Sequence, residues 1–207
     1  MNNTSMTNLD FIGQNDTEYV HFNTDSVENM SYMFSGCSSL ASIDPGRKKE
    51  TTFNTPQVTN MAHMFEKTAI TSIDFKEGIF YYGSVQNTNR MFSGCSKLVT
   101  ASIDRSKITG AISRIDSALY MFENCPLLVA PDLSYSGISN TEIPADETGE
   151  DTSQMVAPVY HMFANTDQNG VVSLNSTITE FTIAEDWINT MEQVGLETTS
   201  ATGGTVL

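Results

Sequence analysis

Hydrophobic positions recur along the chain around one dipeptide, Met-Phe, which occurs five times. The pairs begin at Met33, Met64, Met91, Met121 and Met162, at spacings of 31, 27, 30 and 41 residues. An aliphatic residue precedes each pair by six positions, at Val27, Val58, Val85, Ile115 and Val156. Self-similarity with a period of 20 to 50 residues is typical of repeat architectures. The pattern therefore predicts an array of about five similar units.

Each unit divides into two halves with different periodicity. Val27, Met30, Met33 and Cys37 step by three and four, which predicts a short helix with one apolar face. The segment from Ser39 to Ile43 alternates in the manner of a strand. One short helix and one short strand cannot bury an apolar face alone, so consecutive units must cover one another. Burial of this kind predicts a single row of phenylalanines, made by Phe34, Phe65, Phe92, Phe122 and Phe163.

Outside the regular units the composition changes, which suggests three parts. Residues 1–21 are expected to form an N-terminal arm or cap, and residues 22–183 the repeat array. Residues 134–154 are rich in acidic residues, Ser, Thr and Gly, so we expect an exposed loop inserted in that array. Residues 178–183 indicate a last strand. Residues 184–207 are expected to form a capping helix over 184–194, ended by Gly195, and a tail.

The first unit carries a resemblance to a known family. It reads Val27-Glu28-Asn29-Met30-Ser31-Tyr32-Met33-Phe34-Ser35-Gly36-Cys37-Ser38-Ser39-Leu40, and Met61–Asp74 and Met91–Leu98 repeat it. This motif resembles the BspA-like leucine-rich repeats of the DUF285 type. The resemblance implies an α/β fold, a leucine-rich-repeat-like right-handed solenoid with one strand per repeat. Members of that family are mostly surface adhesins, similar repeats occur in proteins of phages and other viruses, and the family offers no catalytic residues to carry over. Unit lengths vary more here than in the regular arrays of that family.

Charge and composition narrow the choice of partners. The chain has 25 acidic and 10 basic residues, a formal net charge of -15, which opposes binding to nucleic acid or to anionic lipid. The chain has no run of about 18 apolar residues, so we expect no segment that inserts in a membrane. Met1 to Asp10 lacks the basic and apolar regions of a signal peptide, so we expect either use without Sec export or a trimmed ectodomain. The expected partners are protein subunits of a larger multi-copy assembly, or a surface protein or glycan.

The residue just before each Met-Phe pair is the best candidate for a contact surface. This position holds a flat π-system in every unit, and we call the set the planar row: Tyr32, His63, Arg90, Tyr120 and His161. Stacked along an outer helical face, such side chains would contact a sugar ring, a peptide or a neighbouring subunit. A structural reading, with large planar side chains covering the gaps between helices on the convex side, is favoured over a contact surface.

Two further registers have candidate chemistry. Cys37, Cys95 and Cys125 share one position with Thr68 and Thr166, which favours a tight inward site for a small side chain. A Cys95–Cys125 disulfide between neighbouring units is the alternative, and a zinc site lacks the usual ligand spacing. Asp44, Asp74 and Asp104 each follow an isoleucine at the end of a predicted strand. A row of calcium ligands and simple aspartate turns are both possible interpretations, and the turns are favoured.

No pattern in the chain points to catalysis or to a cofactor. The histidines are His21, His63 and His161, and none lies in a nucleophile or metalloprotease motif. We therefore expect a non-enzymatic structural or interaction protein without cofactor. The first hypothesis is a decoration or attachment component of a phage or viral particle. The alternative is an adhesin module at a bacterial cell surface that binds host protein or glycan.

Overall fold

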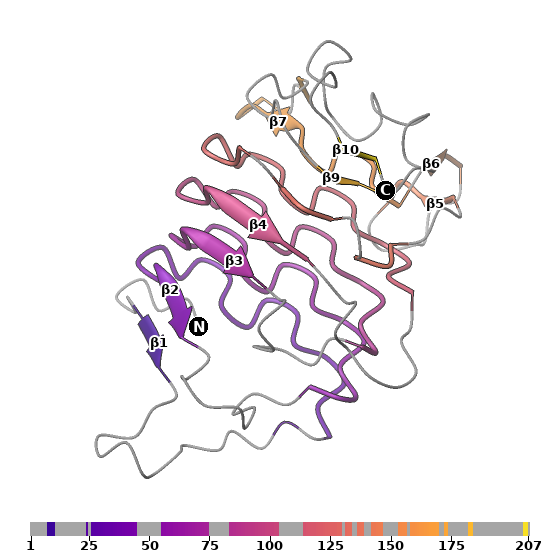
Figure 1. The fold of residues 1–207 in the computed structure, drawn as a ribbon. Helices are drawn as coiled ribbons and strands as arrows, with labels where there is room; N and C mark the ends of the chain where they lie inside the picture. The colour runs from indigo at the N-terminus through magenta and orange to yellow at the C-terminus, as the bar shows by residue number, and fades with distance from the viewer. Residues whose placement is uncertain are drawn as a thin grey trace.

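Consecutive repeat units lie side by side in chain order, as Figure 1 shows for the coils that follow β1 to β4. The protein is described by a computed structural model. It describes residues 8–10, 24, 26–44, 55–74, 83–103, 114–129, 131–133, 136–138, 142–146, 153–156, 158–169, 172–173, 182–183 and 205–206. In the described part, parallel bridges join equivalent positions of four units, from Asn29 to Asn60, Asn87 and Ser117.

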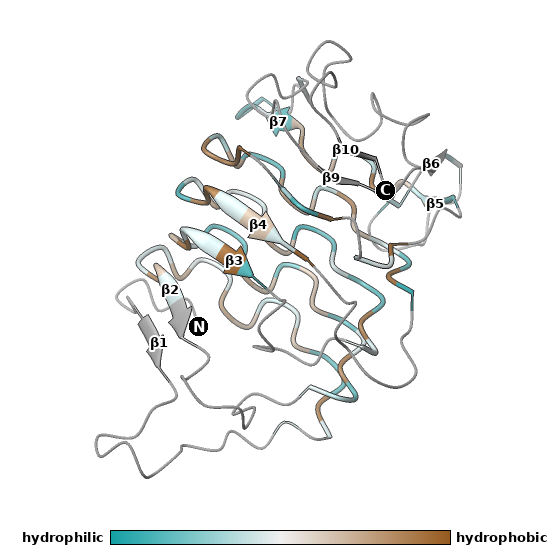
Figure 2. Ribbon diagram, in the orientation of Figure 1, coloured by the Kyte–Doolittle hydropathy of each residue, from teal (hydrophilic) through white to brown (hydrophobic). Residues whose placement is uncertain are grey.

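The strands of the repeat half are short and parallel. They are β1 (Asn8–Asp10) with β2 (Ser42–Asp44), and β3 (Ser72–Asp74) with β4 (Thr100–Ser102). The Thr71 N–H donates to the Ala41 carbonyl, which links the chain before β2 to the chain before β3. Along β3 the residues are exposed, buried and exposed, and in Figure 2 the strand runs from pale through brown to teal. This alternation lets one residue of each strand face the core.

The remaining strands lie toward the C-terminal end. Two pairs are antiparallel: β5 (Ile143–Pro144) with β6 (Met155–Val156), and β7 (Asn165–Thr166) with β8 (Val172–Ser173). The third pair, β9 (Thr182–Ile183) with β10 (Thr205–Val206), is parallel. The expected last strand at 178–183 corresponds in its final two residues to β9. The capping helix expected at 184–194 lies outside the described residues.

The helix predicted in each unit is wrong for the part of the chain that the structure describes, where residues form turns and short strands instead. In the first unit two consecutive turns span the segment from Met30 to Cys37. The Met33 N–H donates to the Met30 carbonyl at 3.3 Å, and the Cys37 N–H to the Phe34 carbonyl at 3.1 Å. The third residue of each turn has a left-handed backbone, with φ of 60° at Tyr32 and 73° at Gly36. Each turn uses four residues, so the turns reproduce the three-and-four spacing that suggested a helix.

Hydrogen bonds between units replace those that a helix would make within itself. The N–H groups of Met30, Tyr32, Phe34 and Gly36 donate to the next unit, to the carbonyls of Asn60, Ala62, Met64 and Glu66 at 2.8–3.0 Å. The same four steps recur at the following interfaces as far as Asn124 and Ala164. The Ser31 N–H, which no turn uses, donates to the Asn29 side-chain oxygen at 2.8 Å. Every backbone N–H from Met30 to Cys37 is therefore bonded, as burial requires.

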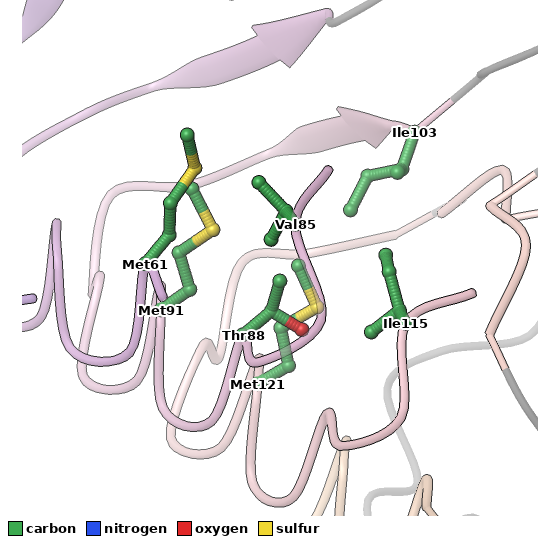
Figure 3. A pocket seen from close by; sticks show the side chains of 7 residues that line it. All are labelled: Met61, Val85, Thr88, Met91, Ile103, Ile115 and Met121. Atoms are coloured by element: carbon green, nitrogen blue, oxygen red, sulfur yellow. The ribbon is translucent and has the colours of Figure 1, made fainter. Parts of the chain in front are cut away.

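The core is organised around the predicted phenylalanine row, which the structure confirms. The rings of Phe34, Phe65, Phe92, Phe122 and Phe163 stack in sequence, with centroids 5.4–5.7 Å apart and planes within 12° of parallel. Beside the row, methionines of successive units meet in one apolar cavity. Figure 3 shows Met61, Met91 and Met121 around it with Val85 and Ile115. Its volume of about 10 Å³ is no more than one water needs, so it is a packing gap and no ligand site.

Two expectations about the irregular segments need correction or extension. The insertion at 134–154 is not simply an exposed loop, because Ser136 and Ile138 are buried and Ile138 bridges Ile115 of the fourth unit. The bridge adds a rung beside that unit, and β5 of the same insertion pairs with β6 directly after the insertion. In the N-terminal arm, β1 extends the parallel pairing of β2 by one strand. The description of the array as a right-handed leucine-rich-repeat-like solenoid stays a prediction.

Candidate binding surface

The planar row occupies one backbone position of unusual conformation in all five units. Its residues have φ of 60° at Tyr32, 59° at His63, 51° at Arg90, 57° at Tyr120 and 52° at His161. The predicted outer helical face is therefore wrong, since each side chain projects from the left-handed corner of a turn. A non-glycine residue in this region costs roughly 1–2 kcal/mol.

Side chains of neighbouring units in the planar row contact one another. Tyr32 stacks on His63 with centroids 4.3 Å apart and planes 10° apart. The Arg90 guanidinium lies over the Tyr120 ring, 4.2 Å from its centroid. Tyr120 meets His161 edge to face at 5.5 Å. The structure thus brings together residues that the sequence placed in one row, and Tyr32 at its N-terminal end is 58 % exposed.

An ion-pair network holds His63 beneath Tyr32. The His63 Nδ1 atom lies 2.9 Å from Glu66 Oε2, and the Lys67 ammonium lies 3.0 Å from Glu66 Oε1. The hydrogen bond from His63 lowers the pKa of Glu66 from 4.5 to about 2, against the opposing effect of burial. Glu66 is therefore ionised at neutral pH and fixes the orientation of the imidazole.

A second carboxylate lies deeper, under the middle of the planar row. Glu123 has a side chain only 3 % exposed, and it forms an ion pair with Arg90. Its oxygens also accept from the hydroxyls of Ser93, at 3.2 Å, and Thr166. A buried charge is tolerated when it is paired and hydrogen-bonded, as this one is. The network ties units three, four and five together.

Glu66 and Glu123 were not identified from the sequence. Both follow directly after a Met-Phe pair, at a position that holds serine in the first and third units. A carboxylate inside an apolar motif was the available signal. The role of Glu123 becomes clear only from the structure, which places Arg90 of the preceding unit beside it.

His161 closes the row in a different environment. Its ring stacks on Tyr160 with centroids 3.7 Å apart, and burial lowers its pKa. The Nδ1 atom is buried without a hydrogen-bond partner among the described residues. His161 is therefore neutral at physiological pH.

A hollow of about 220 Å³ opens beside the N-terminal end of the planar row. Its floor includes buried Ala62 and Asn89, and its walls come from three consecutive units. The lining consists of Ser31, Tyr32, Asn60, Ala62, His63, Asn87 and Asn89. Only two residues of the planar row take part, so Arg90, Tyr120 and His161 lie outside this hollow.

The cysteine register points inward, as the sequence predicted. Cys37, Cys95 and Cys125 are buried free thiols, so the Cys95–Cys125 disulfide is not formed. The Cys95 thiol donates to the Phe65 carbonyl at 3.1 Å, and the Cys125 thiol to the Phe92 carbonyl at 3.2 Å. Burial raises the pKa of Cys95 and, more strongly, that of Cys125. These thiols contribute to packing between units and are poor nucleophiles.

The structure describes two residues of the aspartate register, Asp44 and Asp74, which end β2 and β3. Asp44 pairs with Asp10, whereas Asp74 pairs with Ser102, two residues before Asp104. Asp104 itself lies outside the described residues. Within the described ranges no three His, Cys, Asp or Glu side chains come together as metal ligands. In the same part of the chain no helix is long and apolar enough to cross a membrane.

Stacked units, one phenylalanine row and hydrogen bonds that run from each unit to the next define a repeat protein. A family model described as "Mycoplasma protein of unknown function, DUF285" matches residues 4–131, more than half of the 207 residues, and the chain belongs to this family. No curated protein and no solved structure matched the chain.

Proposed function

We propose that this protein is a non-enzymatic interaction protein whose planar row forms the contact surface. The observation that carries the proposal is the backbone conformation of that row. Five consecutive units place Tyr, His or Arg at a left-handed position where glycine or asparagine would cost less. Strain that persists at one position is a reason to look for a function of the side chain.

The chain itself offers the comparison that strengthens this argument. Each of the first four units has a second left-handed position, four residues after the first. It holds Gly36, Lys67, Gly94 and Asn124, so glycine and asparagine fill three of four places. The planar row uses neither residue in any unit. None of the five is fully buried, and Tyr32, at the N-terminal end of the row, presents more than half of its surface to solvent.

We also propose that the array is a BspA-like, leucine-rich-repeat-like right-handed solenoid. The parallel bridges, the short strands β1 to β4 and the membership in the DUF285 family support this reading. A solenoid suits an interaction protein because its units present one surface repeatedly.

Two settings for this surface follow from the sequence. The family description names Mycoplasma, a bacterium, and this favours an adhesin module at a bacterial cell surface that contacts host protein or glycan. The net charge of -15, useful where many copies are crowded, is the observation in favour of a multi-copy component of a phage or viral particle. In both settings the protein acts by binding.

The settings are distinguished by where the protein is found. Peptides of this chain released from intact bacteria by brief protease treatment would support the cell-surface setting, and their presence in purified virions the other. The contact surface is tested by the double variant Tyr32→Ala with Tyr120→Ala, assayed for adhesion to the target cells or particles. We expect adhesion to fall while the circular dichroism spectrum is unchanged. Unchanged adhesion by a folded variant contradicts the proposed surface.

A further inference from the structure

The hollow beside Tyr32 combines a flat aromatic wall with side-chain amides. Tyr32 and His63 form the aromatic part, as two rings stacked on each other at the side of the hollow, and Tyr32 is exposed to solvent. Asn60 and Asn87 are half-buried, and the amide of Asn89 lies below them. Sites of this kind, concave with a few convergent polar groups, are the usual form of a small-molecule site.

Hydrogen bonds within the repeat orient the two half-buried amides. Asn60 Oδ1 accepts from the Ala62 N–H at 2.9 Å, and Asn87 Oδ1 accepts from the Asn89 N–H at 3.0 Å. With each oxygen held by the turn, the Nδ2 group is left as the donor, and neither Nδ2 has a partner within the described ranges. A primary amide has two N–H donors. The hollow therefore offers oriented donors spaced one repeat unit apart.

The aromatic wall is also held in place. His63 lies under Tyr32 because its Nδ1 atom is bonded to Glu66, so the stacked pair does not have to be ordered when a ligand binds. Preorganised groups favour affinity because less conformational entropy is lost on binding. A flat ring beside fixed hydrogen-bond donors is suited to a ligand with one apolar face and hydroxyl groups at its edge.

The charge of the hollow restricts the ligand further. Among the described residues, no Lys, Arg, Asp or Glu lines it, and the imidazole of His63 is already bonded to Glu66. The surrounding chain carries a net charge of -15, which disfavours anionic ligands. The site thus fits a neutral molecule better than a sialylated, sulfated or phosphorylated one.

We propose that this hollow binds one neutral sugar residue of a glycan. The stacked pair of Tyr32 and His63 packs against C–H groups of the sugar, and the amides of Asn60 and Asn87 donate to its hydroxyl oxygens. This inference rests on the proposed function as an interaction surface and assigns it a ligand class. A peptide is the rival ligand, and the test below separates the two.

The test uses the full chain on an array of neutral oligosaccharides ending in glucose, galactose, mannose or N-acetylhexosamines, with sialylated counterparts beside them. Hits are measured by isothermal titration calorimetry. Tyr32→Ala is expected to weaken binding about tenfold through loss of its aromatic contact with the sugar. Asn60→Asp and Asn87→Asp keep the oxygen that the turn needs but remove the donor, and each is expected to weaken binding by roughly two- to tenfold.

Asn29→Asp is the matched control. Asn29 has the same place in the first unit and the same bond to the backbone, here to Ser31, but it does not line the hollow. Its substitution adds the same charge and is expected to leave sugar affinity unchanged.

Each outcome decides the proposal. Binding of neutral sugars that depends on Tyr32 and Asn60, but not on Asn29, supports it. Absence of sugar binding overturns it, as does a hit that all the variants bind equally well. Selection of peptides that bind in a Tyr32-dependent way, without sugar binding, also overturns it in favour of a peptide site. That result would leave the proposed interaction function standing, whereas unchanged cell adhesion by the Tyr32→Ala and Tyr120→Ala variant would remove it.

Discussion

Substitution of the central phenylalanine tests whether the stacked row holds the units together. Phe92 is fully buried and stacks on Phe65 at 5.5 Å and on Phe122 at 5.4 Å. Phe34 is the matched comparison, because it ends the row, is 6 % exposed, and has Phe65 as its one ring neighbour in the described part of the chain. The two substitutions remove the same atoms but a different number of contacts between units.

The magnitude follows from those contacts. Truncation of a buried phenylalanine to alanine costs about 3–5 kcal/mol. A ring pair contributes about 0.5–1.5 kcal/mol beyond the buried area. Phe92→Ala loses two such pairs and Phe34→Ala one, so we expect about 4–5 kcal/mol for the first and about 1 kcal/mol less for the second. In a repeat array, stability is roughly a sum of unit and interface terms. The difference between the two variants therefore measures the free energy that the second ring contact contributes.

The assay is urea unfolding followed by far-ultraviolet circular dichroism, with the free energy of unfolding extrapolated to water. Slopes against urea must agree between the two variants for the comparison to hold. An equal or larger loss for Phe34→Ala would refute the idea that stacking between units is the main role of the row.

Four further predictions concern the response to pH, the left-handed turn positions and the buried thiols. Glu66 has a folded pKa of about 2, below its ordinary 4.5, so its stabilising effect is complete above pH 4.5 and is lost as the pH falls from there toward 2. The difference in melting temperature between wild type and Glu66→Gln should therefore shrink over this window, and a constant difference would contradict the assignment. Lys67→Gly relieves a left-handed residue and is expected to stabilise by about 0.5–1 kcal/mol in urea unfolding. Gly94→Ala, at φ of 71° and with its new Cβ 3.0 Å from Lys67 Cγ, is expected to destabilise by about 1–2 kcal/mol, so the reverse order of these two variants would be evidence against the turn geometry. The thiols of Cys37, Cys95 and Cys125 should react with Ellman's reagent only after unfolding, and rapid reaction of the native protein would show that they are accessible.

The sequence was sufficient to predict which positions share an environment. The phenylalanine row, the buried cysteines and the buried aliphatic residues at Val58 and Val85 all follow from alignment on Met-Phe. The local backbone could not be read in the same way, because two four-residue turns and a helix produce the same spacing of apolar residues. Gly36 and Asn29 were the available signs of turns, since glycine favours a left-handed corner and asparagine bonds the backbone two residues ahead.

The aspartate register shows why motif alignment alone is not enough for the strands. Ile43 and Ile73 follow their methionines by ten and nine residues, whereas Ile103 follows Met91 by twelve. Hydrogen bonding pairs Ile73, nine residues after Met64, with Ala101, ten residues after Met91. The Ile-Asp motif of the third unit is therefore displaced along the strand by two residues. A shift of two preserves the face of each side chain, so hydrophobic pattern alone does not reveal it.

The spacing of the units in space is much more regular than their spacing in sequence. Between 27 and 41 residues separate successive Met-Phe pairs, yet the phenylalanine centroids stay 5.4–5.7 Å apart throughout. The turn half makes this possible, because its four hydrogen bonds to the next unit fix the step and leave length differences to the rest of the unit. The planar row lies on this rigid half, one residue from the Met-Phe pair. Its side chains are therefore held by a constant backbone step whatever is inserted between units, and precise placement on a rigid element is what a binding surface requires.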